Sequence, residues 1–92
     1  MIIVEFSVVP IGVGVSLSSY VCEAVKVLEN KGVKYQLTAM GTIFEAKTID
    51  EAFKIIMEAH EAVIKAGAVR VITNVKIDDR RDKESSMEKK IE

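Results

Sequence analysis

The sequence contains few aromatic residues and almost no net charge. Its 92 residues include no tryptophan, three phenylalanines and two tyrosines. Modules that stack nucleic-acid bases need several exposed rings, so this composition argues against such a platform. A net charge of −1 provides no strong field that would attract nucleic acid or an anionic membrane surface. We therefore expect neither a nucleic acid nor a membrane among the partners.

Cysteine and histidine each occur once. The single cysteine, Cys22, excludes an internal disulfide framework and a zinc site built from several thiolates. Its position inside a helical pattern predicts a small buried apolar side chain and not a nucleophile. The single histidine, His60, has no second histidine for a metal-ligand pair, so we expect a partly buried structural residue. These observations predict a protein without a catalytic residue, metal site or cofactor, and therefore not an enzyme.

Long hydrophobic runs are also missing. No stretch reaches the ~18 consecutive apolar residues that a membrane-spanning helix needs, and the first residues lack the basic leader of a signal peptide. We expect a soluble cytoplasmic protein. Apolar residues make up 49% of the chain, which is enough to favour a folded state over disorder. The length predicts a single domain over residues 1–92, with a core at 1–79 and a charged linker and C-terminal helix at 80–92.

Hydrophobic periodicity predicts the element order β-α-β-β-α-β. Strands are expected at residues 2–9, 34–40, 42–47 and 69–77. The first helix should begin with Ser16 or Ser18 as its cap and end before Gly32. The second should begin at a Thr48–Glu51 capping box and end near residue 66. This order predicts an α+β, ferredoxin-like fold: a four-stranded antiparallel sheet with both helices on one face.

A short helix is also expected at the C-terminus. The charge run at residues 78–84 is typical of a solvated linker. Ser85 and Glu88 have capping-box spacing, and Met87 and Ile91 fall on one helical face. Such a short helix is not stable alone, so it must dock on the rest of the protein or fray.

The sheet face without helices should carry a mixture of polar and large apolar side chains. Alternation along the strands assigns to this open face Ile3, Glu5, Ser7, Val9, Gln36, Thr38, Met40, Ile43, Glu45, Lys47, Arg70, Ile72, Asn74 and Lys76. A fully solvated face would carry fewer large aliphatic residues. We therefore expect it to be covered by another subunit, by a ligand or by the C-terminal helix. Subunit contact is favoured, because association adds core that a small chain lacks.

Glu45 is the first candidate for ligand binding. A carboxylate in the middle of a covered sheet is unfavourable unless it is paired. One interpretation is a structural ion pair with Lys47, Arg70 or Lys76. The other is that Glu45 receives a hydrogen-bond donor or a cation from a ligand.

The remaining candidates surround Glu45 or lie in the glycine-containing loop after the first strand. Ser7, Thr38 and Thr42 would supply nearby hydroxyl groups, and Met40 could pack against a flat ring. At the start of the first helix, the loop carrying Ser16 and Ser18 could offer backbone N–H groups to an oxygen or an anion. Ordinary helix capping is the alternative interpretation of these two serines.

Three segments together resemble the thiamine-binding protein family. They are Pro10-Ile11-Gly12-Val13-Gly14 followed by Ser16 to Val21, the stretch Tyr35-Gln36-Leu37-Thr38-Ala39-Met40-Gly41-Thr42 with Glu45, and Arg70-Val71 leading to Ile77-Asp78-Asp79-Arg80. The resemblance implies a ferredoxin-like fold and dimers that pair as tetramers. It also implies binding of thiamine, or of its hydroxymethylpyrimidine portion, near the subunit contacts, without catalytic activity.

Two other functions remain compatible with the sequence. Regulatory modules that sense amino acids share this topology and bind small effectors at subunit contacts through a glycine loop. Such modules usually accompany an enzyme, which this chain does not contain. The second alternative is an assembly protein that binds no ligand.

Overall fold

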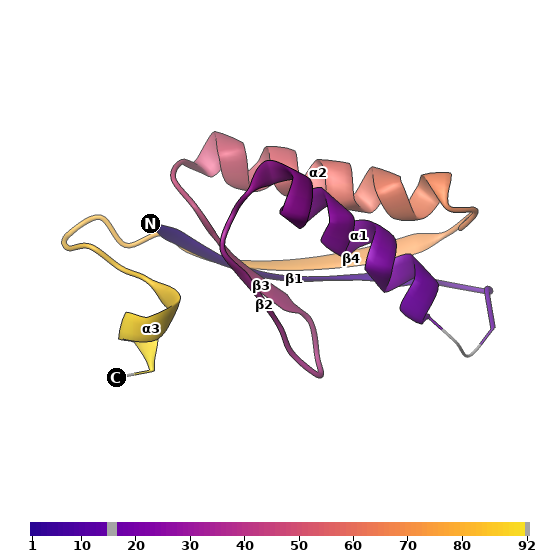
Figure 1. The fold of residues 1–92 in the computed structure, drawn as a ribbon, viewed down its shortest axis with the longest axis horizontal. Coiled ribbons are helices and arrows are strands. Elements are labelled where there is room, and N and C mark those ends of the chain that lie inside the picture. The colour runs from indigo at the N-terminus through magenta and orange to yellow at the C-terminus, as the bar shows by residue number, and fades with distance from the viewer. Residues whose placement is uncertain (15–16, 92) are drawn as a thin grey trace.

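The computed structural model describes residues 1–14 and 17–91. These residues form a sheet with two long helices on one face and a short third helix on the other side (Figure 1). The elements follow the predicted order, with a short helix added at the end. They are β1 (Ile2–Pro10), α1 (Ser18–Lys31), β2 (Tyr35–Leu37), β3 (Thr42–Ala46), α2 (Ile49–Lys65), β4 (Val71–Asp78) and α3 (Met87–Lys90).

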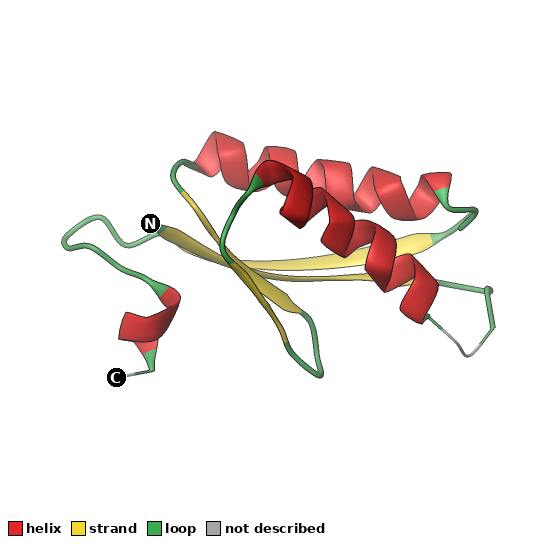
Figure 2. Cartoon of the chain, viewed as in Figure 1, coloured by secondary structure: helices red, strands yellow, loops and turns green. Residues whose placement is uncertain are grey.

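The sheet has the strand order β2-β3-β1-β4, and all neighbouring strands are antiparallel. β1 is central: it pairs with β3 from Ile2↔Ala46 to Phe6↔Thr42. On its other side β1 pairs with β4 from Ile3↔Asp78 to Pro10↔Val71. Each helix connects two strands that are not neighbours in the sheet, and both helices cover the same face (Figure 2). The predicted ferredoxin-like α+β fold is confirmed.

The core lies between the sheet and the two long helices. Along β1, Val4 and Phe6 are buried under the helices, while Glu5 between them is exposed. The rings of Phe6 and Phe44 meet edge to face, with centroids 5.6 Å apart. Such pairs add about 0.5–1.5 kcal/mol beyond the burial of their area. The largest fully buried side chains belong to Phe44, Leu28, Ile55, Val4 and Val63.

The start of α1 differs from the prediction. Leu17 occupies the N-cap position and makes no side-chain capping bond, and Ser18 is already the first helical residue. The capping role assigned to Ser18 is therefore wrong, and Ser16 lies outside the described residues. Cys22 is exposed and not buried as expected. The reason is geometric: α1 turns Ala24 toward the core, and a residue two positions away points about 200° around the helix.

The start of α2 follows the prediction closely. Thr48 is the N-cap, and its Oγ1 accepts a hydrogen bond from the backbone N–H of Glu51 at 3.1 Å. The Glu51 carboxylate reaches one residue further back than expected and accepts from the backbone N–H of Lys47 at 3.4 Å. The first contact satisfies an N–H group of the first helical turn, which has no partner inside the helix. The second satisfies the N–H group of the residue before the cap.

Other element boundaries are shorter or shifted. β2 ends at Leu37, because Thr38 begins a turn in which its Oγ1 accepts from the backbone N–H groups of Met40 and Gly41. At the C-terminus the cap of α3 is Ser86, whose Oγ accepts from the N–H of Lys89 at 3.2 Å. The cap predicted at Ser85 is therefore displaced by one residue, and the lysine three residues after Ser86 cannot complete a capping box.

Candidate functional site

The open face of the sheet carries the side chains that alternation predicts. In the observed register Ile3 lies opposite Glu45 on one side and opposite Asp78 on the other. Glu5 lies opposite Ile43 and Lys76 in the same way. Opposed residues in antiparallel strands project to the same face, so the predicted assignment holds for the strand residues. The turn residues Thr38 and Met40, and Lys47 and Arg70 beyond the strand ends, lie outside the regular alternation.

One end of this face is covered by the chain itself. The segment after β4 folds back beneath the sheet, so that α3 lies on the side opposite α1 and α2 (Figure 1). Ile3 and Glu45, which project toward this segment, are each only 7% exposed. The C-terminal segment, one of the three coverings expected for the open face, covers Glu45.

The contact that satisfies Glu45 comes from the backbone. Its Oε2 accepts a hydrogen bond from the N–H of Met87 at 2.9 Å. Met87 is the first residue of α3, and the first N–H groups of a helix have no partner within that helix. A carboxylate is a favourable acceptor there, because it also faces the positive end of the peptide dipoles. Within the described chain no lysine or arginine lies within ion-pair distance of Glu45, so the interpretation as a structural ion pair is wrong.

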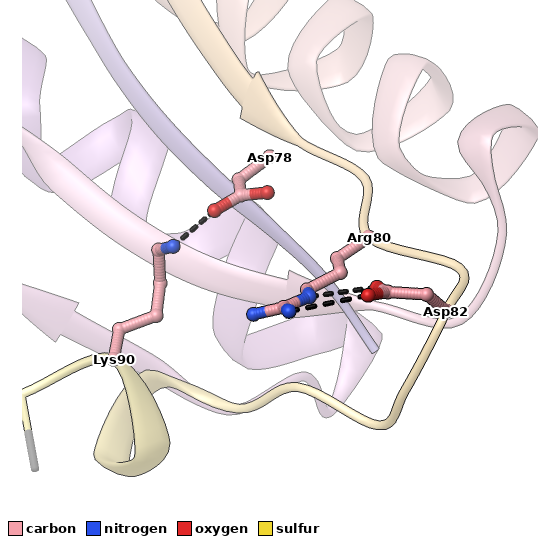
Figure 3. A network of polar contacts seen from close by, with 4 residues as sticks. All are labelled: Asp78, Arg80, Asp82 and Lys90. Carbon is pink, nitrogen blue, oxygen red and sulfur yellow. Dashed lines mark hydrogen bonds and ion pairs between the residues drawn. The ribbon is translucent and has the colours of Figure 1, made fainter.

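Two ion pairs hold the rest of the C-terminal segment against the sheet. Lys34, just before β2, pairs with Glu88 of α3. Lys90 of α3 pairs with Asp78 at the end of β4 (Figure 3). All four side chains are about half exposed, so each pair contributes only about 0–1 kcal/mol. The bond between the buried Glu45 and the partly buried Met87 is therefore the main polar anchor of the segment.

The linker between β4 and α3 is braced by local pairs of opposite charge. Arg80 donates two hydrogen bonds to Asp82, at 2.7 and 3.2 Å (Figure 3). Arg81 binds Asp79 in a similar way, with a shortest distance of 2.7 Å. Hydrogen bonding to the two guanidinium groups lowers the pKa of each carboxyl below its usual value. The charge run predicted to be a solvated linker is thus solvated and internally paired.

The rest of the open face remains uncovered and contains a shallow cavity. Its volume is about 240 Å³. Ser7 of β1 and Met40 of the β2–β3 turn meet in its wall, and Met40 is 87% exposed. The complete lining consists of Glu5, Phe6, Ser7, Met40, Asn74, Val75 and Lys76. Hydroxyl, amide, carboxylate, ammonium and thioether groups therefore converge on one small depression.

The structure does not bring every predicted site residue to this cavity. Thr38 uses its hydroxyl inside the turn, where it also donates to the carbonyl of Gly41 at 2.9 Å. Thr42 lies opposite Phe6, on the face covered by the helices, and is buried. Glu45 lies further along the sheet under the C-terminal segment, and Ser18 lies in α1. Ser7 and Met40 are the two predicted residues that the structure places together.

Glu45 borders a second cavity, which the sequence reasoning did not anticipate. It has a volume of about 490 Å³ and lies beside the turn between α1 and β2. Its lining is rich in charge of both signs and includes Lys31, Lys34, Lys47, Lys54, Asp50 and Glu51. These residues come from two short stretches, 31–34 and 47–54, that share no motif, so no local signal predicted that they would meet.

Metal-ligand groups and membrane-spanning helices were both sought among the described residues. Within residues 1–14 and 17–91, no group of three or more His, Cys, Asp or Glu side chains is arranged to hold a metal ion. No helix in the described chain is both long and apolar enough to cross a membrane.

Comparison with known proteins gives consistent matches over nearly the full length. The sequence profile of the thiamine-binding protein family matches residues 4–92. A UPF0045 protein of Methanothermobacter thermautotrophicus is 46% identical, covering 100% of this chain and 94% of that protein. The UPF0045 protein YqgV of Bacillus subtilis is 43% identical, covering 100% and 92%.

Solved structures show the same fold. Protein MJ1052 of Methanocaldococcus jannaschii superposes with a TM-score of 0.90 at 39% identity, covering 98% of this chain and 91% of that one. A Thermotoga maritima protein, provisionally assigned to thiamine biosynthesis or salvage, superposes with a TM-score of 0.83, covering 98% and 94%. Its identity is 21%, so this second likeness bears on the fold alone.

Proposed function

The chain belongs to the thiamine-binding protein family, and we propose on this basis that it is a non-enzymatic cytoplasmic protein that binds thiamine or its hydroxymethylpyrimidine portion. We further propose that it does so as a homo-oligomer, with the ligand near a subunit contact. The observation that carries the proposal is the uncovered cavity at Ser7 and Met40, on the open face of a chain that matches the family profile over residues 4–92.

The chemistry of the cavity suits this class of ligand. An aminopyrimidine is flat and presents hydrogen-bond donors and acceptors along one edge. The Ser7 hydroxyl and the Asn74 amide can each donate and accept, and Glu5 can accept from an exocyclic amino group. The thioether of Met40 can pack against the ring. The cationic thiazolium of whole thiamine would be favoured near Glu5 and disfavoured near Lys76.

The shape of the cavity supports a subunit contact. A site that binds a small molecule usually buries about 70–90% of the ligand surface. A cavity of about 240 Å³ on an exposed sheet face cannot do so alone. A second subunit placed over Met40 and its surroundings would complete the enclosure. Glu45 could contribute as a ligand acceptor only if Met87 released it, since its Oε2 already accepts from that residue.

Isothermal titration calorimetry with thiamine and with hydroxymethylpyrimidine tests the proposal. We expect binding by the unmodified protein and a loss of affinity of about tenfold in Ser7→Ala and in Met40→Ala, about 1.4 kcal/mol each. Ser19→Ala, the same substitution at an exposed position of α1, is the matched control and should bind normally.

Two results would contradict the proposal. The absence of any heat at millimolar ligand would exclude thiamine binding at a useful affinity. Full affinity in both Ser7→Ala and Met40→Ala would place the ligand elsewhere. A thermal-shift screen with amino acids completes the experiment, because stabilisation by an amino acid alone would favour a regulatory effector-binding module.

A further inference from the structure

The cavity of about 490 Å³ lies where the end of one long helix meets the start of the other. β2 and β3 form a hairpin in which the N–H of Glu45 donates to the carbonyl of Lys34 at 3.1 Å, so the start of β2 lies beside the end of β3. α1 ends just before β2 and α2 begins just after β3, which places both helix ends at the same end of the molecule (Figure 1). An ion pair of 2.8 Å between Lys31 and Glu58 joins the two helices there.

Side chains decide the charge of this cavity. The C-terminal end of α1 and the N-terminal end of α2 both border it. Their peptide dipoles present opposite poles, so the two effects offset each other. Four lysines and three carboxylates line the wall. The contacts that these side chains already make therefore determine what the cavity can bind.

Two of the three carboxylates are held by backbone N–H groups. Glu45 and Glu51 each accept a hydrogen bond from the main chain, at 2.9 and 3.4 Å. Asp50, the third, makes no hydrogen bond or ion pair through its side chain within the described chain. It lies four residues before Lys54 in α2, so the two side chains are on the same side of the helix.

Two of the four lysines have no ion-pair partner. Lys31 and Lys34 pair with glutamates that lie outside the lining. Across residues 1–14 and 17–91, no carboxylate lies within ion-pair distance of Lys47 or Lys54. Both of these residues are exposed. The charges without a partner are therefore two ammonium groups and one carboxylate, which favours an anion over a cation.

The residue types indicate which anion. Among the described residues, no arginine lines the cavity. Arginine binds planar carboxylates through two parallel hydrogen bonds, whereas lysine acts as a compact charge with three donors that suits a phosphate group. The volume falls within the range of about 300–1,000 Å³ that is usual for small-molecule sites and is larger than a free phosphate ion fills. Met1 and Val33 provide an apolar part of the wall for the rest of a ligand.

We propose that this cavity binds a small phosphate monoester. The phosphate lies between Lys47 and Lys54, and a compact apolar body lies against Met1 and Val33. The site is separate from the cavity proposed for thiamine. Met1 precedes β1 and Ser7 lies within it, so about 20 Å separate the two cavities along the strand, at about 3.3 Å per residue.

Titration at low salt, followed by amide NMR, tests the proposal with phenyl phosphate and inorganic phosphate as probes. Neither probe contains a pyrimidine or a thiazolium, so failure here and failure of thiamine binding are separate results. We expect saturable shifts of the amide signals of Gly32, Lys34 and Lys54. Phenyl phosphate should bind about fivefold more tightly than inorganic phosphate, which corresponds to burial of about 40 Å² of the ring.

Charge-removing variants locate the phosphate. Lys47→Gln and Lys54→Gln should each weaken the binding of phenyl phosphate about fivefold, the effect of one charge at about 4 Å in water. Lys65→Gln is the matched control: it removes the same charge from the last turn of α2 and should bind normally. Asp50→Asn should tighten binding by a similar factor, because it removes a negative charge from the wall.

Three results would overturn the proposal. The first is the absence of saturation by phenyl phosphate at tens of millimolar. The second is equal affinity for the two probes, which would mean that the apolar wall receives nothing. The third is an equal loss of affinity in Lys54→Gln and in the control Lys65→Gln, which would reduce the binding to a general response to charge.

Discussion

The carboxylate of Glu45 in β3 and the backbone N–H of Met87 at the start of α3 are joined by a hydrogen bond of 2.9 Å. The bond connects the middle of the sheet to the C-terminal segment. α3 has only four residues, and an isolated helix of that length does not form in water. Its position therefore depends on contacts with the sheet, which include this bond to the buried Glu45.

We predict that Glu45→Ala releases the C-terminal segment. A hydrogen bond to a charged acceptor is worth about 1.5–3 kcal/mol, and the half-exposed ion pairs of Lys34 and Lys90 cannot replace it. Amide hydrogen exchange at Met87 should accelerate, and trypsin should cleave faster after Lys90. Glu45→Gln is the control, since it keeps an acceptor oxygen and should show a smaller effect. Unchanged exchange at Met87 in Glu45→Ala would mean that other contacts hold α3.

A second prediction concerns the two helix starts. Thr48→Ala removes the acceptor of the Glu51 N–H and should lower the free energy of unfolding by about 1 kcal/mol. Ser18→Ala should change it by less than about 0.5 kcal/mol, because Ser18 makes no capping bond. Urea denaturation followed by circular dichroism measures both. A loss at Ser18 as large as that at Thr48 would contradict the position of the α1 start.

These two helix starts show which parts of the fold were predictable. Thr48 and Glu51 have the spacing of a capping box, and an apolar stripe follows them, so local sequence specifies the start of α2. Before α1 two serines were equally suitable, and the structure begins the helix after Leu17 instead. The alternation of β1 was equally informative, because its only two polar residues, Glu5 and Ser7, fall on the same face.

The candidate site was less predictable, because it depends on contacts between distant segments. Sequence spacing indicated that Glu45 would be covered, and the structure agrees. Its partner is Met87, 42 residues later in the chain, and a backbone donor leaves no signal in residue identity. Thr38 was chosen for its hydroxyl, but the same hydroxyl closes the neighbouring turn. Local hydrogen bonding by threonine competes with any role in binding.

A third prediction concerns pH. The hydrogen bond from Arg81 lowers the pKa of Asp79 below its usual 3.8. A carboxyl with a lowered pKa in the folded state favours folding above the usual value, and this contribution is lost as the pH falls through the folded-state pKa. Arg81→Gln should raise the pKa of Asp79 toward 3.8 in a carboxyl NMR titration. Asp82, which pairs with Arg80, is the internal control and should titrate as before. A parallel rise at Asp82 would show that the linker unfolds as a whole.

The last prediction concerns the turn that carries Met40. A Cβ atom added at Gly41 would lie 2.8 Å from the carbonyl oxygen of Phe6 and 3.8 Å from Cβ of Ser7. The first distance is too short for a carbon–oxygen contact, so Gly41→Ala must push the turn away from β1. We expect a loss of about 1–3 kcal/mol in the free energy of unfolding, the usual cost of overpacking.

The same displacement should move Met40 relative to Ser7 and so disturb the proposed thiamine site. Gly12→Ala is the matched control: its backbone has a φ of +82°, so alanine is strained there, but nothing lies within 4 Å of the added carbon. Both variants should lose stability, whereas only Gly41→Ala should shift the amide NMR signals of Phe6 and Ser7. If those signals stay in place in Gly41→Ala, the turn does not rest on β1 and the cavity does not depend on glycine at this position.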